Sequence, residues 1–213
     1  MKKSTVILAA LMAISTVFTA QVQAEPSAKD IKKVQKVAKA RAKELTKQGW
    51  VLQGSTPLET KLEKHLIKLT DFGGTATEFV ATSEGNMDID MGVTEATSNA
   101  AQYYAQNAGS MVKGRIVSQK DKISDEQSKN FVAAFEQLVV KEIKGEFNRS
   151  FVLVKETKNG KKKAYDVQVF YLLDEEAASS ARIRALKQAA AEAKIAEELG
   201  QQISDYINAG FNE

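Results

Sequence analysis

The strongest constraint on the fold is a hairpin signal in the C-terminal half of the chain. Two runs rich in β-forming residues, 147–157 and 164–173, flank the tetrapeptide Lys158-Asn159-Gly160-Lys161. Asn-Gly is the dipeptide most typical of a two-residue hairpin turn. The sequence therefore predicts an antiparallel pair of strands, and the rest of the fold has to be built around it.

Helical periodicity and cap signals dominate most of the remaining sequence. They predict helices over residues 25–48, 56–71, 93–117, 124–144 and 174–208, and the apolar run 50–52 and the segments 75–83 and 87–91 are interpreted as strands. Helices and antiparallel strands in this order indicate an α+β fold. We expect a single domain over residues 25–213, in which helices pack on one small antiparallel sheet and a long C-terminal helix closes the chain.

The first 24 residues have the three parts of a cleavable secretory signal peptide. Lys2 and Lys3 precede a short apolar region, and Val22-Gln23-Ala24 places small residues where a signal peptidase reads them. The mature chain should then begin at Glu25, and we expect it to be periplasmic or secreted. Because Glu25 stands where a bacterial lipoprotein needs cysteine, and the sequence has no cysteine, neither a lipid anchor nor disulfides are expected.

Composition and motifs argue against several chemistries. Without the two lysines of the leader, 28 basic side chains stand against 27 acidic ones, so bulk charge gives no reason to expect nucleic acid as a partner. His65 is the only histidine and lies in a lysine-rich helical segment, where a surface or helix-rim position is expected. The sequence has neither a G-x-S-x-G element nor a phosphate-binding glycine loop. We therefore expect a protein that is not an enzyme and needs no cofactor.

Residues 87–91 alternate between apolar and acidic side chains, which is why they are interpreted as a half-buried strand. Asn86, Asp88 and Asp90 would then offer oxygen atoms on its wet face. Calcium needs six to eight oxygens, and this run departs from an EF-hand loop because Gly92 falls one place late and the bidentate glutamate is missing. Whether the run binds a cation is left open.

Two groups of residues are candidates for binding. The first predicted helix is rich in lysine, and Lys32, Lys36, Lys39 and Lys43 are the candidates for contact with an anionic surface such as lipid head groups or lipopolysaccharide phosphates. A solvated helix face is the alternative for such a charge run, and it applies equally to the lysines at 158 and 161–163. The second group, Trp50, Tyr103 and Tyr104, could line a ligand pocket or contact surface.

The order of motifs resembles a group of uncharacterised exported proteins of Bacteroides-type bacteria. The resemblance is carried by Gly49-Trp50 with Gly54, by Thr56-Pro57-Leu58-Glu59, by the alanine-rich segment 94–111 and by the hairpin residues 165–169. The architecture is more distantly similar to small outer-membrane lipoproteins and to the N-terminal domain of a periplasmic flagellar-assembly protein. This resemblance implies an α+β envelope domain that binds or assembles, and it supplies no catalytic residue.

Together these features predict a non-enzymatic exported envelope protein that acts through protein or surface contacts. An envelope protein is the expected partner, no membrane span is expected, and a homo-oligomer is left open. The alternative is a periplasmic binding protein that holds a small or anionic ligand between the sheet and the helices.

Overall fold

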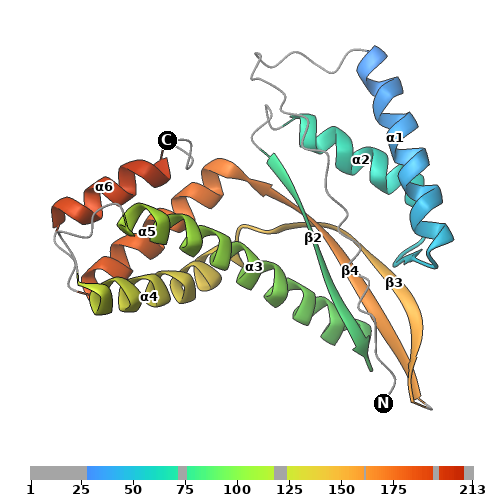
Figure 1. Cartoon of the computed structure of the whole chain (residues 1–213). Helices are drawn as coiled ribbons and strands as arrows, with labels where there is room; N and C mark the ends of the chain where they lie inside the picture. The colour runs from blue at the N-terminus through green and yellow to red at the C-terminus, as the bar shows by residue number, and fades with distance from the viewer. Residues whose placement is uncertain (1–27, 72–75, 118–123, 161, 194–196, 209–213) are drawn as a thin grey trace.

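A computed structural model describes residues 28–71, 76–117, 124–160, 162–193 and 197–208 (Figure 1). In chain order its elements are α1 (Ala28–Lys47), β1 (Val51–Leu52), α2 (Leu58–Asp71), β2 (Ala76–Asn86), α3 (Ile89–Val117), α4 (Asp125–Ile143), β3 (Asn148–Asn159), β4 (Lys162–Asp174), α5 (Glu175–Glu192) and α6 (Glu197–Asn208). The predicted α+β class, with helices on a small antiparallel sheet, is confirmed. The segment interpreted as a signal peptide lies outside the described residues. Within the described ranges, no helix combines the length and the apolar character needed to cross a membrane.

The predicted hairpin is the centre of the sheet. The strand order is β1-β3-β4-β2, and every neighbouring pair is antiparallel. Asn159 pairs with Lys162, so the strand pairing extends one residue further toward the turn than it would with Asn-Gly at the centre of the turn. Gly160 has a φ of +64°, a conformation that glycine adopts without strain.

The two faces of the sheet carry separate hydrophobic clusters (Figure 1). On one face, Phe151, Leu153 and Phe170 pack against Ala38 of α1 and Leu62 of α2. The other face packs against α3, and its cluster continues through α4, α5 and α6. Successive strand residues point to opposite faces of a sheet, so the uninterrupted apolar run at the end of β4 serves both clusters.

α4 shows how the helical side of the molecule is specified by sequence. Its buried residues, Phe131, Phe135, Val139 and Ile143, recur every four positions and form one stripe. Ser124 caps its first turn by accepting a hydrogen bond from the Gln127 amide, and the Gln127 side chain completes the capping box. The helix predicted for residues 124–144 is therefore confirmed.

The predicted strand over residues 87–91 is wrong, because this stretch turns out of β2 into α3. The Asp88 carboxylate accepts hydrogen bonds from the amides of Asp90, at 2.8 Å, and Met91, at 3.2 Å. This is how an N-terminal cap satisfies the first free N–H groups of a helix. A local capping interaction outweighs a short alternation of apolar and acidic side chains.

The predicted long helix over residues 174–208 is also not found, because two helices, α5 and α6, occupy this region. α6 packs back on α5, with Gly200 facing Ala190, and this brings Ile203 and Ile207 into the core beside α3. A straight continuation of α5 would carry both isoleucines away from that core. Their burial, worth about 1.5–3 kcal/mol each, favours the break where no glycine or proline signals it.

Candidate functional site

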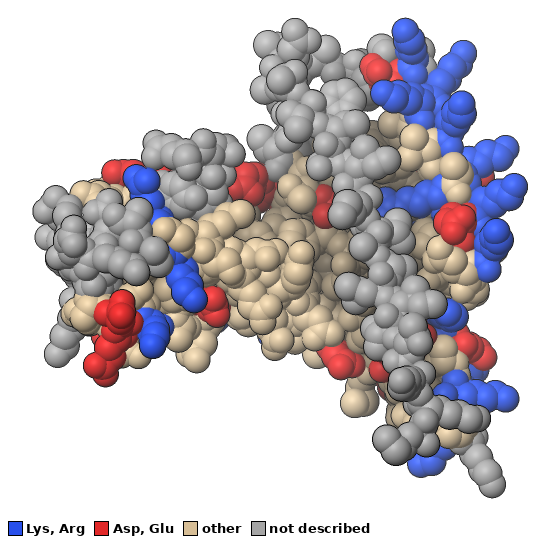
Figure 2. All heavy atoms as spheres, in the orientation of Figure 1, with Lys and Arg blue, Asp and Glu red and all other residues tan. Residues whose placement is uncertain are grey.

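The outer face of α1 concentrates positive charge. Its lysines are all exposed: Lys29, Lys32, Lys33, Lys36, Lys39, Lys43 and Lys47. At 3.6 residues per turn these positions fall within about a third of the helix circumference. Figure 2 shows the Lys and Arg side chains gathered over this helix. We call this surface the lysine face. All four lysines predicted for an anionic contact belong to it.

The lysine face follows from how α1 is anchored. Ala38, Ala42 and Leu45 lie on the opposite side of the helix and are buried against α2 and the sheet. Since the apolar stripe fixes the rotation of the helix, the lysines have to point away from the protein. The acidic residues Asp30 and Glu44 are also exposed on α1.

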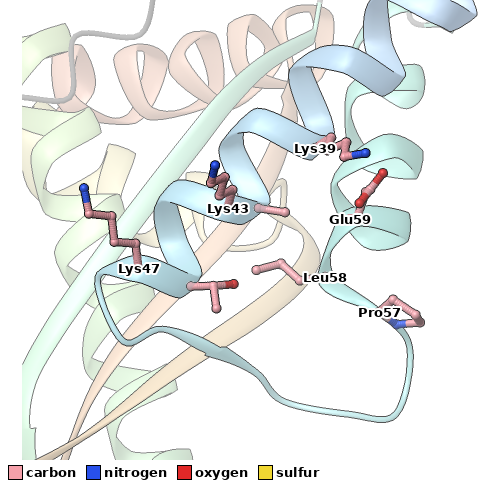
Figure 3. Close-up of a pocket in the computed structure, with 8 residues that line it drawn as sticks. Lys39, Lys43, Lys47, Pro57, Leu58 and Glu59 are labelled. Carbon is pink, nitrogen blue, oxygen red and sulfur yellow. The ribbon is translucent and has the colours of Figure 1, made fainter.

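A shallow groove runs between α1 and the start of α2 (Figure 3). Lys39, Lys43 and Lys47 line the α1 side, one helical turn apart. Pro57, Leu58 and Glu59 line the α2 side, and Figure 3 shows Leu58 between the two helices. The first turn of α2 adds the positive end of a helix dipole. The groove thus has an apolar floor bordered by these lysines, with Glu59 as the acid among its lining residues. In Figure 3 the Lys39 side chain points toward α2, whereas the ammonium groups of Lys43 and Lys47 point away from it.

A partly buried polar cluster ties α1 and α2 to the sheet. Glu78 of β2 accepts two hydrogen bonds of 2.7 Å from the guanidinium of Arg41 in α1. His65 of α2 lies 2.7 Å from the same carboxylate, and Nε2 must be the donor because an ionised carboxylate can only accept. The two helices are therefore fixed to β2 through one side chain.

The surroundings of Glu78 keep it ionised. Burial alone would raise its pKa, but the hydrogen bonds from His65 and Arg41, with the positive charge of Arg41, lower the pKa from 4.5 to about 2. The rings of Phe151 and Phe170 meet the His65 ring edge-on, and the Arg41 guanidinium lies over Phe170, 5.0 Å from its centroid. The cluster is a rigid anchor rather than an open site.

The expectation that His65 lies at the surface or helix rim is wrong. His65 is fully buried, and its Nδ1 has no hydrogen-bond partner among the described residues. One signal could have revealed this: His65 falls three residues after Leu62 and seven after Leu58, on the apolar face of the predicted helix. The lysines around it obscured that spacing.

Trp50, Tyr103 and Tyr104 do not come together. Trp50 packs beside the cluster under α1 and α2, and the Lys155 ammonium lies 5.9 Å from its ring centroid. Tyr103 and Tyr104 belong to α3 on the other face of the sheet, where both contact the ring of Phe79. A single pocket lined by all three aromatic residues is therefore not formed.

Tyr104 has a structural role in α3. Its hydroxyl accepts a hydrogen bond from Arg182 of α5, whose side chain is 2% exposed and also bonds Glu175 at 2.5 Å. Burial raises the pKa of Tyr104, and the Arg182 charge opposes this in part. The Tyr104 hydroxyl therefore helps to hold α3 against α5.

Asn86 and Asp88, two of the three residues considered for a cation, have other side-chain partners, whereas the hydrogen bonds of Asp90 involve its backbone. The Asn86 amide donates to the Ser83 hydroxyl at 3.0 Å, and Asp88 caps α3. Within the described ranges, no cluster of three or more histidine or acidic side chains is arranged to hold a metal ion.

The second group of lysines lies at the end of the β3–β4 hairpin. Lys158 and Lys162 are exposed, whereas Lys163 pairs with Glu156 at 2.7 Å and lies 5.2 Å from the ring centroid of Tyr165. Lys161 is outside the described residues. Among the residues that the structure describes, the hairpin end therefore presents fewer exposed lysines than α1.

No protein family, no curated protein and no solved structure matches this chain. The resemblance to exported Bacteroides-type proteins stays a prediction from the sequence.

Proposed function

We propose that this protein is a non-enzymatic exported envelope protein, and that it acts by binding phosphate groups on an anionic membrane surface through the lysine face of α1. The observation that carries the proposal is the arrangement of these lysines on one side of a helix whose other side is anchored. Each lysine near an anionic bilayer contributes about 1 kcal/mol of attraction. Several lysines on a rigid support can act together without first being ordered.

The groove beside the lysine face supports contact with individual phosphates. Lys39, Lys43 and Lys47 border it, and the helix dipole at the start of α2 offsets part of the negative charge of Glu59. The described helices present no large aromatic side chain beside these lysines, so attraction rather than insertion should hold the protein on the surface. Binding should therefore be reversible and sensitive to salt.

Vesicle flotation tests the proposal. The chain from Glu25 onward is mixed with vesicles containing about a third phosphatidylglycerol, and with neutral vesicles, near 0.1 M salt. We expect flotation with anionic vesicles only. It should be lost near 1 M salt, because the Debye length falls from about 10 Å to about 3 Å.

A matched pair of variants locates the contact. In the first variant, Lys36, Lys39 and Lys43 are all changed to glutamine, which should weaken binding about a hundredfold. The control variant changes the exposed residues Lys129, Lys141 and Lys187 of α4 and α5 to glutamine, which removes the same charge, and it should bind like the native protein. Equal losses in both variants would indicate general charge attraction and contradict a site on α1.

The alternative is a soluble anionic ligand in the groove. Inorganic phosphate and polyphosphate, added without vesicles, distinguish the two sources of phosphate. If they bind at micromolar concentration while anionic vesicles do not float the protein, the groove is a ligand site and the membrane proposal is wrong.

A further inference from the structure

The exposed side of α3 carries a strip of uncharged side chains with one charged residue at each end. The strip consists of Glu95, Asn99, Gln102, Tyr103, Gln106, Ser110 and Lys113, and all of these residues are exposed. From residue 96 to residue 112 the helix contains no charged residue. Figure 2 shows the uncharged surface over this helix. We call it the α3 strip.

This strip is unusual on a chain in which 27% of the residues are charged. An exposed helix face normally carries charge for solubility, as α1 does. The α3 strip instead presents amides and Tyr103, which is 61% exposed. Depletion of charge around an exposed tyrosine is typical of the core of a protein interface.

The arrangement of the strip is complementary to itself. Residue 104 lies midway between Glu95 and Lys113, and also midway between Gln102 and Gln106. If a second α3 packs antiparallel on this strip, with the two-fold axis crossing the helix at the level of residue 104, Glu95 of each copy faces Lys113 of the other. Gln102 then faces Gln106, and each amide can both donate and accept a hydrogen bond. A two-fold interface requires this kind of self-complementarity.

We propose that a second copy of this chain docks antiparallel on the α3 strip, making a two-fold dimer. Its charged pairs lie at the ends of the contact, about 27 Å apart at 1.5 Å per residue. Attraction at both ends fixes the register, and the uncharged middle allows two identical surfaces to meet without like-charge repulsion. The dimer does not depend on membrane binding, although it would present two lysine faces at once.

Charge reversal with rescue tests the dimer. The chain from Glu25 onward, which includes every residue of the described fold, is studied by sedimentation velocity over a range of concentrations. We expect a reversible dimer. Glu95→Lys should raise its dissociation constant about tenfold or more, because two attractive pairs become repulsive. Glu95→Lys combined with Lys113→Glu should restore the dissociation constant to within about threefold.

Two further variants keep the test decisive. Glu84→Lys makes the same charge reversal at an exposed position of β2 and should leave the dimer unchanged. Burial raises the pKa of Glu136 in α4, and the positive charge of Lys113 opposes this rise. Lys113→Glu would replace that attraction with repulsion, which could destabilise α4. If that chain does not fold, Gln102→Glu with Gln106→Lys replaces it, because this pair should tighten the dimer several-fold.

Three results would overturn the inference. The first is a native chain that stays monomeric up to millimolar concentration. The second is a dimer that Glu95→Lys leaves unchanged. The third is a loss that folded Glu95→Lys/Lys113→Glu fails to restore. Each of these results can be distinguished from a failure of the vesicle flotation test, because the α3 strip and the lysine face share no residue.

Discussion

The hydrogen bonds and ion pair that hold α1 and α2 to the sheet all meet at the Glu78 carboxylate. A carboxylate with a folded pKa of about 2 and an ordinary value of 4.5 is favoured in its ionised form by roughly 3 kcal/mol. This contribution is fully present above about pH 4.5. It is lost progressively as the pH falls toward about 2, since the unfolded chain takes up a proton first.

This gives a prediction for the acid stability of the protein. Denaturant unfolding followed by the fluorescence of Trp50, which packs beside the cluster, should show decreasing stability between pH 4.5 and pH 2.5. Glu78→Gln should lose roughly 3 kcal/mol at pH 7 and show a clearly shallower decrease over that acid range. Parallel pH curves for the two proteins would mean that Glu78 is not the group responsible.

The lysine face and the polar cluster around Glu78 differ in how far the sequence could predict them. The lysines are close together in one helix, so their spacing already indicated a common face. Arg41, His65 and Glu78 come from three elements, and their meeting depends on the sheet register and on how the helix pair docks. Helical spacing could have placed His65 inside, but no local pattern could have supplied its partner.

At the scale of elements, α3 is fitted closely to the sheet at its start. A Cβ added at Gly92 would lie 2.5 Å from Cγ2 and 3.1 Å from Cβ of the buried Val167. A Cβ at Gly114, in the same helix, would meet nothing within 4 Å. The first glycine permits close packing of α3 on β4, whereas the second only weakens the helix.

The same substitution should therefore have opposite effects at the two positions. Gly92→Ala should destabilise the protein by about 1–3 kcal/mol, because the branched Val167 side chain cannot move aside without strain. Gly114→Ala should stabilise it by up to about 1 kcal/mol through helix propensity. Thermal unfolding of both variants checks the pair, and a stabilising Gly92→Ala would show that α3 can shift away from β4.

Elements with strong and unopposed local sequence signals could be predicted. Elements whose local signals conflict with one another, or with packing in the core, could not. The hairpin and the helix begun by Ser124 carry signals that nothing opposes. At residues 87–91 a capping aspartate competes with an alternating pattern, and the cap prevails. The break between α5 and α6 has no glycine or proline to mark it, and it follows from burying Ile203 and Ile207 on the distant α3 side of the core.

Considered as a whole, the molecule is a sheet shared by two unequal hydrophobic clusters. The cluster under α1 and α2 is much the smaller, and α1 also carries the repulsion among its own lysines. Few buried contacts and concentrated like charge both favour local opening. The α1–α2 side should therefore open before the side built from α3 to α6.

Hydrogen exchange can test this division. In Glu78→Gln the amides of α1 and α2 should exchange up to about a hundredfold faster at pH 7, which corresponds to the roughly 3 kcal/mol lost at the anchor. The amides of α3–α6 should stay within about threefold of the native protein.

Arg184→Gln is the matched control on the other side, where it breaks ion pairs of 2.6 Å to Glu142 and 3.0 Å to Glu146. Because those pairs are exposed, its effect should be small and confined to α4 and α5. An increase spread evenly over all helices in Glu78→Gln would instead mean that both clusters unfold as one unit, and the lysine face would then be as firmly held as the rest of the protein.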